Sequence, residues 1–569
     1  MRRLIYIFII GLLLCSYTWA DGSRYASKSL LSEGKWVKIR VDKTGIYKLS
    51  YADLKNMGFS DPSKVSVHGY GGWPLDEDFS KEYIDDVPST PVWRGSDYLL
   101  FYGKGPVKWE YDSSSQTFVH TNNPYSLYGY YFVTDATPTN DMTSVAQASG
   151  ASTRITTYDD YLLHEQELVS VNQSGREFFG EDFSGARPRT ISTFSSIPGI
   201  TDADGKVTMR FISRINSGSG TASLSINDSE LLDITIPSIQ TVSSNVRSYT
   251  KAIPGTTTAL WKGSKSEKNN VVVSYSSSGH TNVRLDYIRM QFVRTLRPYG
   301  ASTFFRSLTS VGNASRFVIS EANSNTLVFD VTDALNVKRV EADLNGSELS
   351  FTIPAGRLRE FVLVQTNQTF PSPEVVGEVA SSNLHGLEQR DMIIISAPSL
   401  VQQAERLAVA HREKDGLTVE VVTPEAIYNE FSSGTPDATA YRRLMKMFYD
   451  RSSSLGNPPK YLLLFGDGIY DNRGISGEVQ GVSRSNMLLT FQSQESLNVY
   501  SYATDDYFAF LEDNSGSNFS RDKMCLGVGR FPIRTVTEAT QMVDKVISYM
   551  ENKNTGSWKN NLCFMADDG

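Results

Sequence analysis

The sequence predicts a multidomain protein in which N-terminal β domains, sandwich-like or jelly-roll-like, precede an α/β domain with a mainly parallel sheet. Three observations support this. The 569 residues exceed what one hydrophobic core accommodates. Aromatic residues are abundant, and Ser, Thr and Gly recur through the first two thirds, which favours strands and turns. After Gln389, unbroken apolar strands alternate with amphipathic helices, a pattern typical of a parallel sheet covered on both faces.

The overall composition is that of a globular protein and argues against nucleic-acid binding. Apolar residues make up 40% and charged residues 21% of the chain. The net charge is −8, and no basic cluster offsets it. We therefore expect no nucleic acid among the partners.

The N-terminus predicts export. Two arginines precede an apolar run over residues 4–14, and a small-residue cleavage site ends at Ala20. The run is too short to span a bilayer comfortably. Lipid attachment at Cys15 is disfavoured because Leu14 stands where a lipoprotein signal has a small residue. Residues 1–20 are therefore predicted to be a cleaved signal peptide.

Two β regions are expected to follow. The first spans residues 21–155, with an alternating strand at 36–41 and a strand leading into a short helix within 44–59. The second spans residues 175–385, where an Asp204-Gly205 hairpin turn and several short strands recur at sandwich-like intervals.

Residues 389–569 are expected to form an incomplete α/β domain. One helix is predicted to open with Thr435 as N-cap and Pro436 as first residue. Another has a capping box from Thr535 to Glu538. The other expected elements are strands at 391–396, 417–422, 460–467, 524–530 and 561–568, a helix at 398–416, and a hairpin at 502–513. Cys525 and Cys563 lie within the predicted strands and are expected to be buried, small apolar residues.

Acidic residues follow the strands of this domain. In open parallel sheets, ligands and catalytic groups gather beyond the carboxyl ends of the strands. The candidates for lining a cleft there are Asp467, Asp471, Asp505, Asp506, Asp567 and Asp568. They are suited to binding calcium or a basic substrate side chain, but aspartates in such places also cap turns and helices. No metal-binding motif is found, and calcium is the only cofactor for which the residues leave room.

No complete catalytic motif is present. The sequence has no G-x-S-x-G elbow and no H-E-x-x-H helix. Gly466-Asp467-Gly468 lacks the third glycine of a phosphate loop, and its acidic side chains repel phosphate. None of the six histidines follows a strand of the α/β domain. No Cys–His or Ser–His–Asp arrangement can be assembled from these residues.

Several of these segments together resemble the gingipain-like cysteine peptidase family. In the α/β region they are DMIIISAPSL (391–400), PKYLLLFGDGIYDNRG (459–474), GVGRFPIRTVTEATQMVDKVISYM (527–550) and FMADDG (564–569). Upstream, SEGKWVKIRVDKTGIYKLSYADLKNMGF (32–59) and SGREFFGEDF (174–183) are similar to one branch of the family, the sortases of the type IX secretion system.

The resemblance implies a caspase-like domain with a Cys–His dyad at the carboxyl ends of its strands. It also implies an exported endopeptidase of a Gram-negative bacterium, located in the periplasm, in the outer membrane or at the cell surface. The implied partners are secreted cargo with a C-terminal targeting domain, outer-membrane secretion components, and a lipopolysaccharide-type anchor to which cargo is transferred. The family's histidine and cysteine would fall beyond Gly569, so the sequence is expected to be a fragment that is inactive alone. Asp567 and Asp568 match a family loop near the cleft.

A second hypothesis is a non-catalytic surface or carbohydrate-binding protein. In this interpretation the jelly-roll-like region at 190–300 is the active module, and the α/β segment is a relic.

Overall fold

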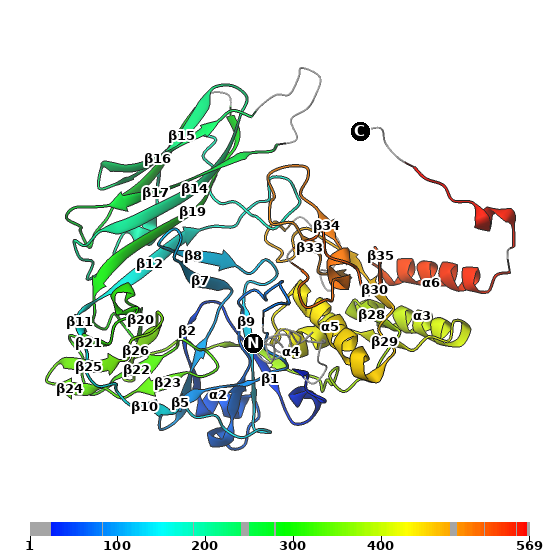
Figure 1. Ribbon diagram of the computed structural model, residues 1–569, viewed down its shortest axis with the longest axis horizontal. Helices are drawn as coiled ribbons and strands as arrows, with labels where there is room; N and C mark the ends of the chain where they lie inside the picture. The colour runs from blue at the N-terminus through cyan, green and yellow to red at the C-terminus, as the bar shows by residue number, and fades with distance from the viewer. Residues whose placement is uncertain are drawn as a thin grey trace, which may run out of the picture.

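The computed structural model describes residues 24–81, 83–185, 187–239, 250–277, 280–477, 486–516, 518–553 and 555–565. The predicted signal peptide, Asp567 and Asp568 lie outside these ranges. Antiparallel sheets occupy the N-terminal two thirds, and the α/β part lies beside them (Figure 1). This confirms the predicted fold class. Within the described ranges, no helix has the length and apolarity needed to cross a membrane.

The N-terminal part is built on two sheets with a shared core. Val37, Ile39 and Val41 of strand β1 (Val37–Val41) lie in this core, and a capping box of Ser50 and Asp53 starts helix α2 (Tyr51–Asn56) directly after strand β2 (Gly45–Ser50). The larger sheet has the order β27 (Glu374–Glu378), β1 (Val37–Val41), β9 (Gly129–Thr134), β3 (Ser66–His68) and β4 (Ser89–Thr90). The smaller has the order β2 (Gly45–Ser50), β6 (Tyr98–Gly103) and β5 (Val92–Arg94). A hairpin of β7 (Val107–Asp112) and β8 (Thr117–Asn122) projects from this part.

A β-sandwich follows, with alternate residues of both sheets in one core. Met209 and Phe211 of β14 point into that core, whereas Arg210 between them is on the outer face. One sheet is β12 (Thr157–Glu165), β19 (His280–Thr295), β14 (Gly205–Ile215) and β17 (Ile253–Trp261). The other is β13 (Arg189–Thr190), β18 (Val271–Ser276), β15 (Ser219–Ile226) and β16 (Ser229–Pro237).

A separate aromatic core lies between two further sheets, in which Phe305, Phe317, Phe351 and Phe361 pack on one another. One sheet is β10 (Ser144–Val145), β23 (Lys338–Val340), β22 (Thr326–Asp330), β26 (Phe361–Gln365) and β20 (Ser302–Phe305). The other is β11 (Thr153–Ile155), β21 (Ser315–Ile319), β25 (Glu348–Ile353) and β24 (Asp343–Asn345). The chain therefore places two cores within the region from which one sandwich-like domain is predicted.

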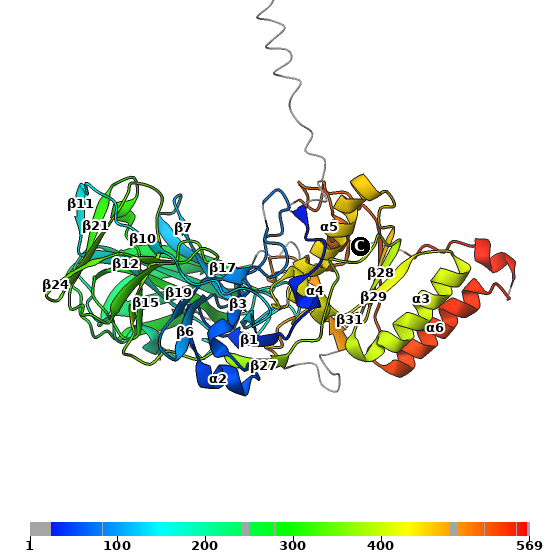
Figure 2. The same ribbon diagram turned by 90° about the horizontal axis from the view of Figure 1, so that it is seen from below.

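The C-terminal part has a parallel sheet with helices on both faces. Its strand order is β29 (Val419–Val422), β28 (Met392–Ser396), β30 (Tyr461–Phe465) and β35 (Gly527–Phe531). Helices α3 (Val401–Lys414) and α6 (Val536–Met550) lie side by side on one face, and α4 (Pro424–Phe431) and α5 (Ala438–Leu455) cover the other (Figure 2). The capping box predicted at Thr535 and Glu538 is present.

Two local predictions in this part are wrong. The N-cap of α5 is Asp437, whose carboxylate accepts the Thr439 N–H at 2.8 Å. Thr435 is unavailable because its hydroxyl donates to the Gly71 carbonyl and accepts the Tyr130 N–H. The stretch from 502 is also not a self-contained hairpin. Its short strand β34 (Ala503–Thr504) pairs with β33 (Phe491–Gln492), and a 3₁₀ turn η8 (Asp506–Ala509) follows.

The predictions for the two cysteines and the last strand are also wrong in the described residues. Cys525 precedes β35 by two residues and is half-buried. Cys563 is exposed, and residues 561–565 form no strand. Leu562, Phe564 and Met565 are 85–94% exposed, because this segment runs on from α6 without a neighbouring strand to pair with.

The N-terminal part and the α/β part share a buried polar interface. Lys38 of β1 is only 6% exposed and contacts the α/β part. Its ammonium group donates to Asn429 Oδ1 at 2.9 Å and lies over the Tyr130 ring. Burial lowers the pKa of Lys38 to about 8, although the charge of Glu425 opposes this.

One side of helix α5 faces the N-terminal part and carries three charged residues that are completely buried. These residues, the charged stripe of α5, are Arg442, Lys446 and Asp450. Lys446 Nζ bonds both Asp450 and Asp513 at 2.6 Å. Arg442 lies over the Phe79 ring, and its guanidinium donates to acceptors of three different segments. These acceptors are the Phe510 carbonyl at 2.6 Å, the Glu77 carbonyl at 2.6 Å and Ser515 Oγ at 2.9 Å.

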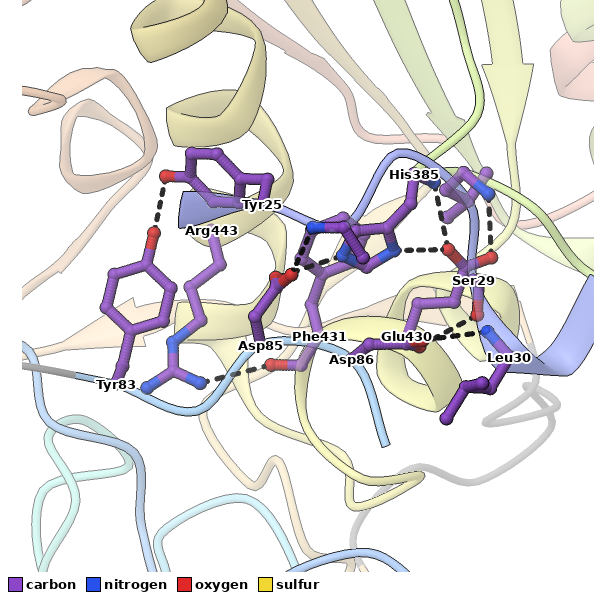
Figure 3. Close-up of polar contacts among 12 residues, drawn as sticks. Tyr25, Ser29, Leu30, Tyr83, Asp85, Asp86, His385, Glu430, Phe431 and Arg443 are labelled. Atoms are coloured by element: carbon purple, nitrogen blue, oxygen red, sulfur yellow. Dashed lines mark hydrogen bonds and ion pairs between the residues drawn. The ribbon is translucent and has the colours of Figure 1, made fainter. Parts of the chain in front are cut away.

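His385 forms a second buried junction (Figure 3). Its Nδ1 lies 2.7 Å from Glu430 and its Nε2 lies 3.0 Å from Asp85, so both parts of the chain contribute a carboxylate. The ring stacks on Phe431. Burial alone would lower the pKa of His385, but the hydrogen bonds and charges of the two carboxylates outweigh it and raise the pKa to about 9. The imidazole is therefore protonated at neutral pH.

We expect Arg442→Met to lower the free energy of unfolding by about 3 kcal/mol, because three buried acceptors lose their donor. Urea denaturation followed by tryptophan fluorescence measures this. Arg406→Met is the matched control. Its exposed ion pair with Asp544 is expected to contribute less than about 1 kcal/mol. Equal effects of the two substitutions would contradict the assigned role of Arg442.

We expect the stabilising effect of His385 to depend on pH. A histidine whose pKa is raised in the folded state stabilises fully below its unfolded pKa of about 6.5, and this is lost as pH rises through the folded value. His385→Gln should therefore cost about 3 kcal/mol more at pH 6 than at pH 9.5. Urea denaturation across this range measures the difference. The charged groups that surround the ring are Asp85, Asp86, Glu430 and Arg451.

His68→Gln is the control for this series. Burial lowers the pKa of His68, so protonation at low pH opposes folding at this position. Its substitution should therefore cost less at pH 6 than at pH 9.5, the opposite trend to His385→Gln. If the cost of His385→Gln did not depend on pH, this would contradict a protonated His385 that bonds both Asp85 and Glu430.

Candidate active-site rim of the parallel sheet

The carboxyl ends of β30 and β35 lie next to each other, because the two strands pair in parallel from Tyr461 and Gly527 to Phe465 and Phe531. The chain leaving β30 stays attached to the chain leaving β35. The Gly466 N–H donates to the Phe531 carbonyl, and the Asp467 N–H donates to the Ile533 carbonyl at 3.0 Å. These two exits form the rim on which the predicted aspartates are placed.

Asp505 is held at the rim by Arg530. Its two oxygens accept Arg530 Nε and Nη2 at 2.9 and 2.8 Å. The same guanidinium also donates to the Gly466 carbonyl at 3.2 Å and the Leu489 carbonyl at 3.1 Å. One arginine thus ties the exit of β30 to two later loops, and the bidentate geometry fixes the orientation of the carboxylate.

Asp467 is also occupied by an arginine. Its Oδ2 accepts Arg534 Nε at 2.5 Å, and its Oδ1 accepts the Gly468 N–H at 2.8 Å. The side chain of Asp467 is 15% exposed and that of Arg534 is 50% exposed. Solvent therefore screens this pair more than the pair of Arg530 and Asp505.

Asp471 and Asp506 have different surroundings. Asp471 is fully buried and organises its own loop, accepting the N–H groups of Gly474, Ile475 and Ser476. Asp506 is exposed at the start of η8. The structure thus brings Asp467 and Asp505 to a common rim, turns Asp471 inward, and leaves Asp506 toward solvent.

Sequence reasoning missed the two arginines of the rim. It considered only the acidic residues that follow the strands, and it gave Arg530 and Arg534 no role. The signal in the sequence was the position of these two arginines relative to the end of the strand. Arg530 and Arg534 flank the end of β35 at the place where the neighbouring exits are acidic, so charge pairing across the rim was foreseeable.

Neither described cysteine is arranged as a catalytic nucleophile. Cys525 donates its backbone N–H to the Ala509 carbonyl at 2.8 Å, and its thiol lies 3.8 Å from the Lys523 carbonyl. His411 pairs with Asp415 on α3, and His385 is enclosed by Asp85 and Glu430. Over the described ranges, no three His, Cys, Asp or Glu side chains converge as metal ligands.

Comparison with known proteins identifies the class of this part of the chain. Residues 385–569 match the model of peptidase family C25, so the chain contains a C25 peptidase domain. Beyond that domain, the chain is similar to PorU from Porphyromonas gingivalis, whose crystal structure is described as dimeric and latent. The identity is 37%, the TM-score is 0.85, and the match covers 95% of this chain. The chain spans 52% of the length of that PorU chain.

Other comparisons give much weaker matches. A carbohydrate-binding module of family 6 from LamC of Zobellia galactanivorans is 16% identical, with a TM-score of 0.13. The match covers 23% of this chain and 98% of the module. No match was found among curated proteins.

We expect Arg530→Met to loosen the rim. Loss of the bidentate pair and of two carbonyl contacts should cost about 2 kcal/mol and accelerate amide hydrogen exchange over residues 486–505. Mass-spectrometric hydrogen exchange measures this segment directly. Arg534→Met, which breaks the more exposed pair, is expected to cost less than about 1 kcal/mol. Unchanged exchange in Arg530→Met would show that the network does not hold the rim together.

Proposed function

We propose that the protein is an exported cysteine endopeptidase of the PorU type, which removes the C-terminal targeting domain of type IX cargo and transfers the cargo to a surface anchor. The observation that supports this most is the extent of the similarity to PorU. It includes the β-rich two thirds as well as the C25 domain. A C25 domain alone does not distinguish between peptidases of different roles. The β sheets that precede it narrow the comparison to proteins with the same domain arrangement.

The chemistry proposed is acyl transfer through a thiolate activated by histidine. Backbone N–H groups at a strand end would stabilise the oxyanion, and water or an amine would resolve the thioester. In the residues described here the rim contributes only bound aspartates and arginines. We therefore assign it to shaping the cleft, and we assign neither Cys525 nor Cys563 to the nucleophile.

The proposal is tested with the complete gene product and a cargo protein bearing a C-terminal targeting domain. The expected result is removal of that domain, blocked by iodoacetamide, and conjugation of the cargo to an added primary amine. Cleavage without amine conjugation would retain the peptidase and exclude the transfer step. Absence of cleavage would favour the non-catalytic alternative.

We expect the double substitution Cys525→Ser and Cys563→Ser to leave the rate of cargo cleavage within about twofold of the parent, because neither thiol lies at the end of a strand beside a histidine. Cleavage assays of the parent and the variant measure this. A loss of 100-fold or more would identify one of these cysteines as the nucleophile and overturn our assignment.

A further inference from the structure

A short segment between β12 and β13 lies against the C25 domain. It consists of residues 172–178, which we call the strap, and it forms neither a strand nor a helix. The strap overlaps the segment SGREFFGEDF (174–183), which the proposed chemistry does not use. Its main partner is the loop 493–502 of the C25 domain, which joins β33 to β34. Asp505 directly follows β34, so this loop leads into the rim.

The strap is hydrogen-bonded to the loop at both of its ends. Asn172 Nδ2 donates to the Asn498 carbonyl at 2.6 Å and to Ser501 Oγ at 2.9 Å. At the other end, the Glu177 N–H donates to Ser496 Oγ at 2.8 Å, and the Ser496 N–H donates to Glu177 Oε2 at 3.1 Å. Ser496 is completely buried. This reciprocal pair fixes how the loop lies on the strap.

Arg176 connects the strap with both of its neighbours. Its Nε donates to the Gln492 carbonyl at 2.8 Å, and its backbone N–H donates to the Ser493 carbonyl at 3.2 Å. The guanidinium carbon lies 4.5 Å from the centroid of the Phe491 ring. On the side of the N-terminal part, Nη1 bonds Glu77 at 2.6 Å. Because Phe491 and Gln492 form β33, Arg176 holds the strand from which the loop begins.

Gly175 permits the close approach of strap and loop. Its φ is +76°, in the left-handed region that favours glycine. A Cβ atom at this position would overlap Ser496 Oγ and the Glu495 carbonyl oxygen, and it would lie 2.9 Å from Ser496 Cα. The backbone conformation and the contact with the loop therefore both require glycine here.

The strap also contacts the chain that leaves β30. The Phe178 ring stacks on the Tyr470 ring, with centroids 6.4 Å apart and an interplanar angle of 16°. The Arg473 guanidinium lies 5.4 Å from the Phe178 centroid and is held by Glu167. Tyr470 and Arg473 follow Asp467 along the chain. Both segments that adjoin the rim are therefore in contact with one stretch of the β domains.

We propose that the strap positions the rim. Its positioning residues are Gly175, Arg176 and Glu177. They fix the loop 493–502, and through it they fix Asp505. A displacement of about 1 Å by a residue far from the chemistry can lower a rate about 100-fold, so the strap makes turnover depend on the β domains. This effect on turnover rests on the proposed function, whereas the effect on the loop does not.

Gly175→Ala tests the strap by mass-spectrometric hydrogen exchange. The matched control is Gly218→Ala, because Gly218 has a φ of +77° but open space around its Cβ position. Both variants have the same backbone strain, and only Gly175→Ala displaces the loop. We expect amide exchange over residues 493–505 to be at least tenfold faster in Gly175→Ala and unchanged in Gly218→Ala. Equal exchange of this segment in the two variants would overturn the proposal.

Asn172→Ala is a milder second variant, because it removes two donors from a half-buried residue and adds no volume. Its control is Asn140→Ala, which removes two hydrogen bonds to Ser89 within the N-terminal part. We expect exchange over residues 493–502 to be at least threefold faster in Asn172→Ala and unchanged in Asn140→Ala. This pair decides if Gly175→Ala fails to fold, and unchanged exchange in Asn172→Ala then overturns the proposal.

The effect on turnover is measured with the complete gene product and a cargo protein bearing a C-terminal targeting domain. Active sites are counted by titration with an active-site-directed inhibitor, so that unfolded molecules do not lower kcat. We expect Gly175→Ala to lower kcat per active site at least tenfold, with KM within about threefold of the wild type, and Gly218→Ala to change neither. An unchanged kcat per active site would overturn the positioning role. If the wild type cleaves no cargo, the proposed function is wrong, and the exchange experiment alone decides on the strap.

Discussion

The charged stripe of α5 is the constraint on which the arrangement of the chain depends. Arg442, Lys446 and Asp450 are completely buried, on the side of the helix that faces away from the parallel sheet. Charges in such a place destabilise a fold unless each finds a partner. Both parts of the chain supply these partners. From the N-terminal part, Arg24 and Tyr25 bond Asp450, and the Glu77 carbonyl accepts from Arg442. The N-terminal part therefore completes the pairing of a helix that belongs to the C25 domain.

This constraint extends to the rim through a short series of contacts. Arg442 donates to the Phe510 carbonyl at the end of η8, and Asp505 directly precedes η8. Asp505 in turn holds Arg530, which lies on β35. The β domains thus support the position of the rim through α5. This series of contacts connects the N-terminal part with the carboxyl ends of the strands.

The sequence predicts the helices and strands of this chain better than it predicts the tertiary contacts around them. Apolar runs such as residues 461–465 identify a buried parallel strand from composition alone, and the capping box at Thr535 marks a helix start locally. Thr435 has the local features of an N-cap, but a contact with Gly71, over three hundred residues away, uses its hydroxyl. The burial of Lys38 and Arg442 likewise depends on contacts between segments far apart in the sequence, which no local pattern contains.

The same distinction applies to the candidate site. The sheet topology, which local patterns predict, determines where the aspartates lie. The hydrogen bonds and ion pairs of each carboxylate depend on residues that reach the rim from other segments. Arg534 and Arg530 neutralise Asp467 and Asp505, and three backbone N–H groups bind Asp471. A carboxylate held in this way is poorly placed to meet a basic substrate side chain, since it must first release its partner. Of the four aspartates described, Asp506 alone is exposed, whereas the carboxylates of the other three are bound by the arginines and backbone N–H groups around them.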